Sequence, residues 1–241
     1  MPSTNTALIA ALTDPAPPAH GAVYRTEAQP AGRGQAGNRW HSSPGANLTL
    51  SLLLRPDRLS VERLPSLIQY AALAVRRAVA TCVPAQSVSV KWPNDVYVGD
   101  RKVAGVLIQN GLRGERVQWS VVGIGLNVNE QAFPPALQRR ATSLRQLTGK
   151  PHDLPAVTQS LFWTLSEGYE RIESGQWRLL RQEYLRHLYL RGVEASFCDV
   201  ATGQPFRGVI QDTDHGGRLR ILVQGGRLRT FDLREVEFLT R

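Results

Sequence analysis

Two lysines lie close together in a chain that otherwise carries its positive charge on arginine. Of the 29 Lys and Arg residues only three are lysines, and Lys91 and Lys102 stand eleven positions apart. A lysine ammonium is a compact charge on a flexible stem, which suits an oxygen atom whose charge changes during a reaction. Codon usage that favours arginine accounts for the same count equally well. The residues around these lysines must therefore show whether they have a chemical role.

The neighbours of both lysines predict a hairpin with polar groups at one end. Pro93 ends a first strand, which places Asn94 and Asp95 at a strand end, and a turn at Gly99-Asp100 sends the chain back. Lys102 is then expected to reach the same side of the hairpin as Asp95. A lysine, a carboxylate and an amide in one pocket suit phosphate and metal handling, whereas a solvated hairpin with surface charges is the alternative.

A glycine-rich loop precedes this hairpin. Residues 32–37 read Gly-Arg-Gly-Gln-Ala-Gly, but a dinucleotide-binding motif needs a helix that opens on the glycines, and residues 38–45 with Trp40 and Pro44 cannot continue as a helix. We interpret the loop as a flexible lid whose Arg33 clamps an anion, with an ordinary surface loop as the alternative. A third segment, residues 123–129, brings backbone close to a neighbour at Gly123 and Gly125 and offers Asn127 as a donor and acceptor.

The elements that must position these groups follow from hydrophobic spacing and from turn residues. Ser3, Thr4 and Asn5 provide N-cap chemistry for a short first helix. A strand with a nearly continuous apolar run is predicted at residues 47–54, with burial on both faces. Further strands are predicted at residues 22–27, 87–91, 95–98, 102–109 and 117–128, and helices at residues 60–83 and 156–190, the last broken near 174–175.

The chain changes character after Gly192. Five short strands separated by glycine-rich turns are predicted at residues 193–200, 206–212, 219–223, 228–231 and 235–239, which indicates a small barrel. Hairpins outnumber β-α-β units in the first part, which favours an α+β fold over a doubly wound parallel sheet. We therefore expect two domains, residues 1–190 and 191–241.

Composition indicates an ordinary globular protein with a basic charge. Hydrophobic residues make up 42% and charged residues 20%, and the net charge is +9, which helps to attract nucleic acid, nucleotides or an acidic protein. The longest apolar run, residues 64–75, is shorter than the roughly 20 residues that span a bilayer. No basic residue precedes the apolar run at residues 7–12, so a secretory signal is not expected. These features predict a cytoplasmic protein without a membrane partner.

Taken in order, the segments STN, GRGQAGNRW, SSPGANLTLSLLL, KWPNDV, RKVAGVLI and VVGIGLNVN resemble the biotin protein ligases, also called biotin–[acetyl-CoA-carboxylase] ligases. The resemblance covers about residues 3–130, and the tail is similar to that family's small SH3-like domain. It implies a mixed sheet with flanking helices, a biotin/lipoate ligase-like fold related to class II aminoacyl-tRNA synthetases, plus a small SH3-like β-barrel.

The resemblance also implies a two-step reaction and its residues. The biotin carboxylate attacks Mg-ATP to give biotinyl-5′-AMP, and a lysine of a biotin carboxyl carrier protein then attacks that anhydride. Lys102 and Arg33 take the catalytic roles, and Asp95 is the candidate Mg²⁺ ligand. The implied biotin-binding residues are Ser3, Thr4, Asn5, Gln29, Gly32, Arg33, Gly34, Gln35, Lys102, Gly105, Gly123 and Gly125. The implied ATP-binding residues are Arg33, Trp40, Asn94, Asp95, Lys102 and Asn127.

The sequence departs from the family's usual GRGRxGR pattern, because Gln35 and Asn38 replace two arginines. A loop with less charge is expected to hold biotinyl-AMP less firmly. Since the STN segment begins at Ser3, we expect a monofunctional ligase without a DNA-binding domain; a homodimer stays open. The rival interpretations are a lipoate–protein ligase of related fold and a basic nucleic-acid-binding protein in which arginines and aromatics clamp strands.

Overall fold

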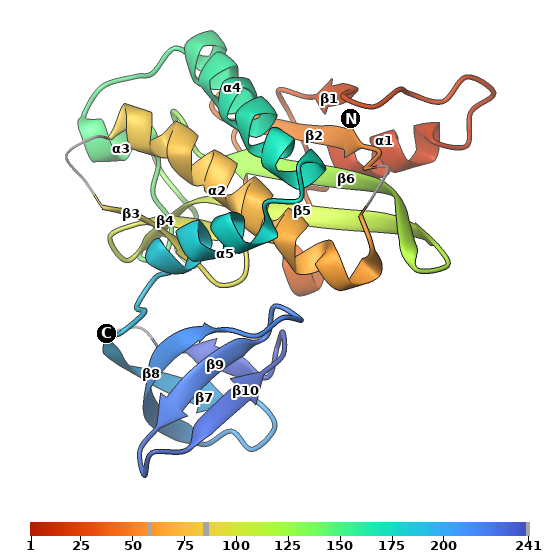
Figure 1. Cartoon of the computed structure of the whole chain (residues 1–241). Helices are drawn as coiled ribbons and strands as arrows, with labels where there is room; N and C mark the ends of the chain where they lie inside the picture. Colours follow the sequence, from red (N-terminus) through yellow and green to blue (C-terminus); the bar gives the residue numbers. More distant parts are fainter. Residues whose placement is uncertain (57–58, 84–86, 240–241) are drawn as a thin grey trace.

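The computed structural model describes residues 1–56, 59–83 and 87–239 and contains two antiparallel sheets (Figure 1). The larger sheet has six strands in the order β1-β2-β6-β5-β4-β3, and the smaller one has five in the order β10-β9-β8-β7-β11. Among the described residues, parallel pairing is confined to isolated bridges such as Lys102 with Ala141. Helices cover the larger sheet, so the predicted α+β class is confirmed.

The elements of the larger part agree with the predicted ones in type and nearly in extent. Its strands are β1 (Val23–Arg25), β2 (Leu48–Leu54), β3 (Val88–Lys91), β4 (Asp95–Val98), β5 (Arg101–Arg113) and β6 (Arg116–Leu126). Its helices are α1 (Thr4–Ala11), α2 (Leu64–Cys82), α3 (Leu144–Thr148), α4 (Leu154–Glu173) and α5 (Trp177–Arg186), with 3₁₀ turns η1 (Gln35–Gly37) and η2 (Val61–Arg63). The predicted helix at 156–190 is broken at Ser174-Gly175, where Gly175 has a positive φ of 69°, and α3 is an element that the sequence analysis did not predict.

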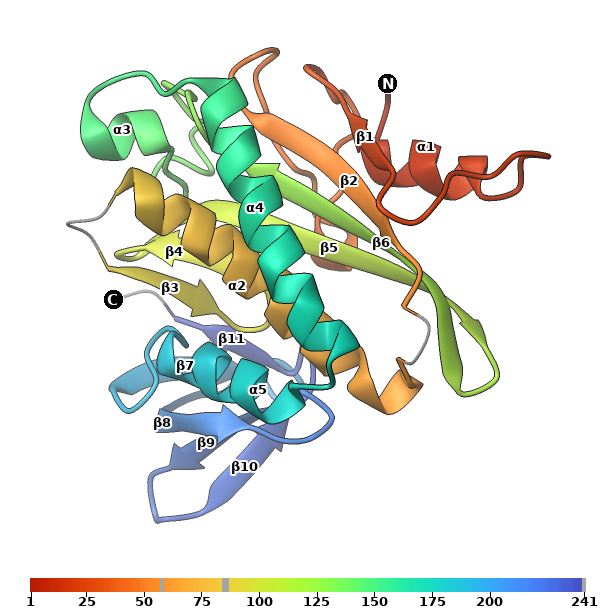
Figure 2. The ribbon, with the colours of Figure 1, turned by 45° about the horizontal axis from the view of Figure 1, so that its top comes forward.

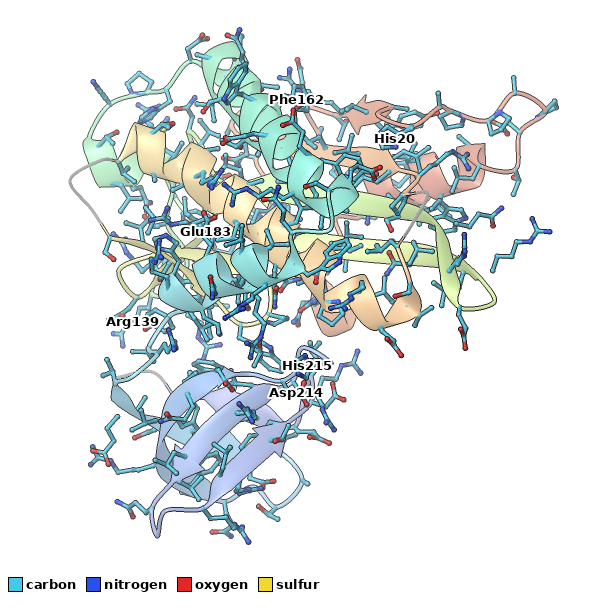
Figure 3. The ribbon with its side chains drawn as sticks, viewed as in Figure 1. His20, Arg139, Phe162, Glu183, Asp214 and His215 are labelled. Carbon is cyan, nitrogen blue, oxygen red and sulfur yellow. The ribbon has the colours of Figure 1, made fainter. Side chains whose placement is uncertain are left out.

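The smaller sheet consists of the five strands expected after Gly192, and it is curled upon itself (Figure 1). These strands are β7 (Glu194–Asp199), β8 (Pro205–Thr213), β9 (Leu219–Val223), β10 (Leu228–Phe231) and β11 (Val236–Phe238). The β8–β9 turn, where Figure 3 labels Asp214 and His215, points toward the larger sheet. There the Trp92 indole donates to the Gly217 carbonyl at 2.8 Å. We propose that residues 1–190 and 191–241 are two domains joined by contacts of this kind.

The two faces of the larger sheet have different partners. Helices α2, α4 and α5 lie over one face (Figure 2), where Leu50, Val106 and Ile124 enter the main core. The opposite face carries α1, and a smaller cluster of Leu8, Leu53 and Val121 packs there. All seven residues of β2 are buried, which confirms the predicted burial on both faces.

Partly buried ion pairs connect the three helices of this layer. Glu183 of α5, labelled in Figure 3, accepts hydrogen bonds from Arg77 of α2 at 3.0 and 3.1 Å and from Arg171 of α4 at 2.6 Å. Burial tends to raise the pKa of this carboxyl, but the two guanidinium groups outweigh that effect and hold the pKa below its ordinary value. None of the helices in the described ranges is long and apolar enough to cross a bilayer.

Candidate active site

A cavity of about 290 Å³ opens on the face of the larger sheet opposite α2 and α4. Most of the residues predicted from the sequence line it: Ser3, Thr4, Asn5, Gln29, Arg33, Gly34, Gln35, Trp40, Asp95, Lys102, Gly105, Gly123 and Gly125. They come from the start of α1, the glycine loop, β4, β5 and β6. This volume is at the lower end of the roughly 300–1,000 Å³ of small-molecule pockets.

Neutral polar side chains form a hydrogen-bonded cluster at one end of the cavity. Gln29 Oε1 accepts from the Thr4 backbone N–H at 2.9 Å and lies 3.3 Å from its hydroxyl. The Ser51 hydroxyl contacts both Thr4 Oγ1, at 2.8 Å, and Asn5 Oδ1. Asn5 Nδ2 in turn donates to Gln109 Oε1 at 3.2 Å. Such a cluster is suited to a neutral ligand with paired donors and acceptors.

Helix capping explains why the chain start sits there. Ser3 has an extended backbone, and its side chain accepts from the Thr6 N–H at 3.4 Å, so it is the N-cap of α1. The first turn of α1 therefore points Thr4 and Asn5 into the sheet, and both side chains are buried. The predicted N-cap role of this segment is confirmed.

Glycines line the floor of the cavity and leave it free of side chains. A Cβ at Gly123 would lie 2.2 Å from Asn5 Oδ1, and one at Gly125 would lie 2.4 Å from the Trp40 ring. A Cβ at Gly105 would lie 3.0 Å from Lys102 Nζ. At the first two positions a side chain would require Asn5 or Trp40 to shift, since real Cβ atoms do not come so close to neighbours. The register pairs Gly105 with Gly125 across β5 and β6, so these two glycines lie side by side.

Lys102 and Asp95 meet at the centre of the site. Lys102 Nζ lies 2.7 Å from Asp95 Oδ2 and 5.5 Å from the centre of the Trp40 ring. A β-bulge between β4 and β5 pairs Tyr97 with Lys102 and Val96 with Ala104, which turns Lys102 onto the face of Gly105. Both backbone polar groups of Lys102 are hydrogen-bonded as well. Its N–H donates to the Arg140 carbonyl, and its carbonyl accepts from the Thr142 N–H.

The glycine loop forms a small closed hairpin at the edge of the cavity. The backbones of Arg33 and Arg39 pair in an isolated antiparallel β-bridge. The Gly34 N–H donates to the Asn38 carbonyl at 2.7 Å, and the Trp40 N–H donates to the Gly32 carbonyl at 3.0 Å. The loop contains a three-residue 3₁₀ turn and no α-helix, in agreement with the rejection of a dinucleotide-binding motif. Arg33 itself is exposed on the loop, as an anion clamp requires.

Three predicted residues lie outside the lining of this cavity. Asn94 is buried and its amide donates to the Val106 carbonyl, while Asn127 is buried and donates to the Thr142 carbonyl at 3.0 Å. Gly32 is buried in the stem of the glycine loop, where a Cβ would lie 2.6 Å from the Trp40 carbonyl. The side-chain amides of Asn94 and Asn127 thus hold backbone carbonyls in place, and Gly32 allows the close approach of Trp40.

Other residues reach the site that sequence reasoning missed. Ser51 and Gln109 lie on the face of Asn5, and the alternation of polar and apolar positions along their strands could have revealed them. Lys91, which the sequence analysis singled out beside Lys102 without giving it a role, also lines the cavity. Its Nζ lies 4.7 Å from the centre of the Phe238 ring, and burial lowers its pKa against the opposing charge of Asp95. Strand β11 and the turn before it contribute residues of the C-terminal part to the wall, for which periodicity gives no signal: Leu233, Arg234, Val236, Glu237 and Phe238.

One carboxylate at the centre suits a magnesium ion held mainly by its substrate. Mg²⁺ commonly takes one or two protein carboxylates together with phosphate and water oxygens. Asp95 lines the cavity with one oxygen on Lys102. The described residues contain no group of three or more His, Cys, Asp or Glu that makes a dedicated metal cage. The donor set thus fits an ion that arrives with a polyphosphate.

Comparison with known proteins gives the same picture. The family model described as "Biotin/lipoate A/B protein ligase family" matches residues 1–127. A biotin–[acetyl-CoA-carboxylase] ligase of Mycobacterium tuberculosis is 32% identical over 228 residues, which are 92% of this chain and 81% of that protein. The bifunctional ligase/repressor BirA of Bacillus subtilis is 35% identical over 151 residues, which are 62% of this chain and 46% of that protein; the match thus spans less than half of its length.

The fold of nearly the whole chain is similar to that of a solved structure. A biotin protein ligase from Aquifex aeolicus in complex with biotin and ATP has a TM-score of 0.80 at 26% identity, and the match covers 99% of this chain and 95% of that one. The family model spans more than half of the residues, and the Mycobacterium relative is matched over most of both chains. The chain therefore belongs to the biotin/lipoate A/B protein ligase family.

Proposed function

We propose that this protein attaches biotin to a lysine of a biotin carboxyl carrier protein, through biotinyl-5′-AMP and at the cost of ATP. The observation that carries the proposal is the sequence of groups along one cavity. The neutral polar cluster around Asn5 lies at Gly123, and the Lys102–Asp95 pair and Trp40 lie two residues further along β6, at Gly125. The neutral ring of biotin would lie at the polar cluster, and its acyl chain would lead to a carboxylate at Lys102. The nucleotide would then lie beyond that carboxylate.

In the first step, a biotin carboxylate oxygen attacks the α-phosphorus of ATP. The bond from that phosphorus to the bridging oxygen breaks, and pyrophosphate leaves. Lys102 supplies a fixed positive charge where negative charge shifts between oxygens, and Arg33 supplies a second one from the loop. Asp95 lines the cavity and would hold a bound Mg²⁺, which would supply charge neutralisation for the triphosphate.

In the second step, the neutral amine of a carrier lysine attacks the acyl carbon of biotinyl-AMP. The bond from that carbon to the phosphate oxygen breaks, AMP leaves, and the amine proton passes to solvent. No protein nucleophile is needed, so catalysis consists of positioning and of charge stabilisation. The partner in this proposal is the carrier domain, and DNA has no role in it.

The polar cluster favours biotin over lipoate. The ureido ring of biotin offers both N–H donors and a carbonyl acceptor to groups such as those of Thr4, Asn5 and Ser51. The dithiolane ring of lipoate offers neither, so it gains no hydrogen bonds from this cluster. Selection against lipoate follows from those missing hydrogen bonds.

The test is a carrier assay with two parallel arms. The protein is incubated with Mg-ATP, a carrier domain and either biotin or lipoate, and the carrier lysine is examined by mass spectrometry. We expect a biotinylated lysine, biotin-dependent exchange of pyrophosphate into ATP, and little modification with lipoate. An unmodified carrier together with an absence of exchange overturns the proposal, and equal use of lipoate overturns the assigned specificity.

A further inference from the structure

A buried carboxylate joins the segment after β6 to the segment that leads into β2. Glu130 is 4% exposed. Its Oε2 accepts from the Ser43 backbone N–H at 3.0 Å and from Asn47 Nδ2 at 2.7 Å, while Oε1 accepts from the Ser43 hydroxyl at 2.7 Å. Burial tends to raise the pKa of this carboxyl, but the hydrogen bonds from Ser43 and Asn47 outweigh it and lower the pKa. The group is therefore an ionised acceptor with matched donors.

The connection extends beyond the carboxylate. The Glu130 carbonyl accepts from the hydroxyl of Ser143, the N-cap of α3, at 2.6 Å. The Val128 N–H donates to Asn47 Oδ1 at 2.9 Å, and the Asn129 N–H donates to the Ala46 carbonyl at 2.8 Å. The segment after β6 is thus fastened both to α3 and to the segment that leads into β2.

Ser43, which is hydrogen-bonded to Glu130, lies three residues after Trp40 in the chain. The Trp40 N–H closes the stem of the glycine loop on Gly32 at 3.0 Å, and the Trp40 ring lies against Gly125 and over Lys102. Ser43 is the anchored residue that follows it. The loop's other stem is held separately, because the Ala31 N–H donates to the Pro2 carbonyl at 3.1 Å. Trp40 is thus three residues from Ser43, which Glu130 holds through two hydrogen bonds. The neighbouring residues Ser42 and Gly45 are held by Asn47 and by the Glu27 carbonyl.

We propose that Glu130 is a positioning residue that fixes the C-terminal stem of the glycine loop and thereby holds Trp40 over the cavity floor. It touches none of the reacting groups. Its effect on the reaction rests on the proposed function, whereas its effect on the loop does not. A carboxylate is required because all three groups that face it are donors, and an amide would turn its own donors toward one or more of them.

Limited proteolysis tests the loop without any substrate. Arg33 and Arg39 are trypsin sites within the loop, and Arg113 and Arg116 are exposed sites in the distant β5–β6 hairpin. We expect Glu130→Gln to be cut at Arg33 and Arg39 about threefold to tenfold faster than the wild-type protein, as loss of about one hydrogen bond predicts, with cutting at Arg113 and Arg116 unchanged. Glu115→Gln, which changes an exposed glutamate in that hairpin, is the matched control.

A second measurement follows the ligand. Release of biotinyl-AMP from Glu130→Gln is expected to be about threefold to tenfold faster, with kcat for adenylate formation at saturating substrates close to wild type. Ser43→Ala removes one of the three hydrogen bonds and is expected to have a smaller effect in the same direction. The double variant is expected to release no faster than Glu130→Gln, because both changes break the same link.

The proteolysis results distinguish the positioning role of Glu130 from the proposed function. Unchanged cutting at Arg33 and Arg39 in a folded Glu130→Gln protein overturns the proposal. If Glu130→Gln is also cut faster at Arg113, the variant is generally unfolded, and Ser43→Ala then decides by the same comparison. Faster cutting of the loop without any biotinyl-AMP formation in the wild-type protein supports the positioning role and counts against the proposed function alone.

Discussion

The two faces of strands β2, β5 and β6 differ where the second face borders the cavity. On one face Leu50, Val106 and Ile124 pack beneath α2 and α4. On the other face Gly105 and Gly123 line the cavity, and the Ser51 hydroxyl joins the polar cluster through Thr4. Since side chains alternate along a strand, adjacent residues serve stability and chemistry separately. Substitutions one position apart should therefore have different consequences.

The strongest contrast is expected at Lys102. Lys102→Ala should lower biotin-dependent exchange of pyrophosphate into ATP by about 10²–10³-fold, as loss of one charge-stabilising group does. Its unfolding temperature should stay near that of the wild-type protein, because the ammonium lies at the end of a hairpin and is partly exposed. Lys150→Ala, at an exposed position, is the control. Full exchange activity in Lys102→Ala would show that the chemistry lies elsewhere.

The comparison is sharpest at two adjacent residues of β6. In Gly123→Ala the new methyl group meets Asn5 Oδ1 at 2.2 Å, so the KM for biotin should rise at least about tenfold, measured by exchange kinetics. In Ile124→Ala, on the opposite face, the unfolding free energy should fall by about 2–5 kcal/mol, measured in urea, while the KM for biotin stays close to wild type. The reverse pairing of effects would contradict the division between the faces.

A smaller effect is expected in the glycine loop. Gln35→Arg restores a guanidinium beside the cavity and should slow release of biotinyl-AMP by a few-fold, about what one exposed charge contributes. Release is measured by rapid filtration of the preformed complex. Gln159→Arg on the outer side of α4 adds the same charge elsewhere and should leave release unchanged. If Gln35→Arg slows release no more than this control, the loop's reduced charge has no bearing on retention.

The smallest effect belongs to the helix layer. The pKa of Glu183 is below its ordinary value of 4.5, so its ionised form stabilises the fold above that pH and the contribution is lost as the pH falls through the lower folded value. The difference in unfolding free energy between the wild-type protein and Glu183→Gln should therefore shrink below pH 4.5. Urea titrations at a series of pH values measure it, and a constant difference would contradict the assignment.

Much of the fold could be predicted from sequence because its signals are local. Apolar spacing gave α2 and α4, turn residues gave the five strands of the smaller sheet, and the ordered motifs indicated the residues that line the cavity. Helix α3 was missed because its five residues, Leu144–Thr148, span little more than one turn. Periodicity needs several turns before it is visible.

The rest of the site depends on contacts between distant segments. Asn94 and Asn127 are the polar residue types that a nucleotide site uses, yet their amides donate to the carbonyls of Val106 and Thr142. Glu130 holds Ser43 across 87 positions of the chain. A single sequence states neither the direction of a side chain at a strand end nor which remote loop supplies its partner, so the structure was needed for both.

Trp40 has a consequence for how occupancy of the cavity can be followed. Its indole N–H is buried and, among the described residues, has no hydrogen-bond partner, while the ring lies beside the Lys102 ammonium. A molecule that fills the space over Gly125 has to move this ring or cover it, and either event changes the electric field on an indole. Trp40 and Trp92 both line the cavity, so a ligand-dependent change in tryptophan emission that Trp40→Phe abolishes is the expected unlabelled signal of occupancy.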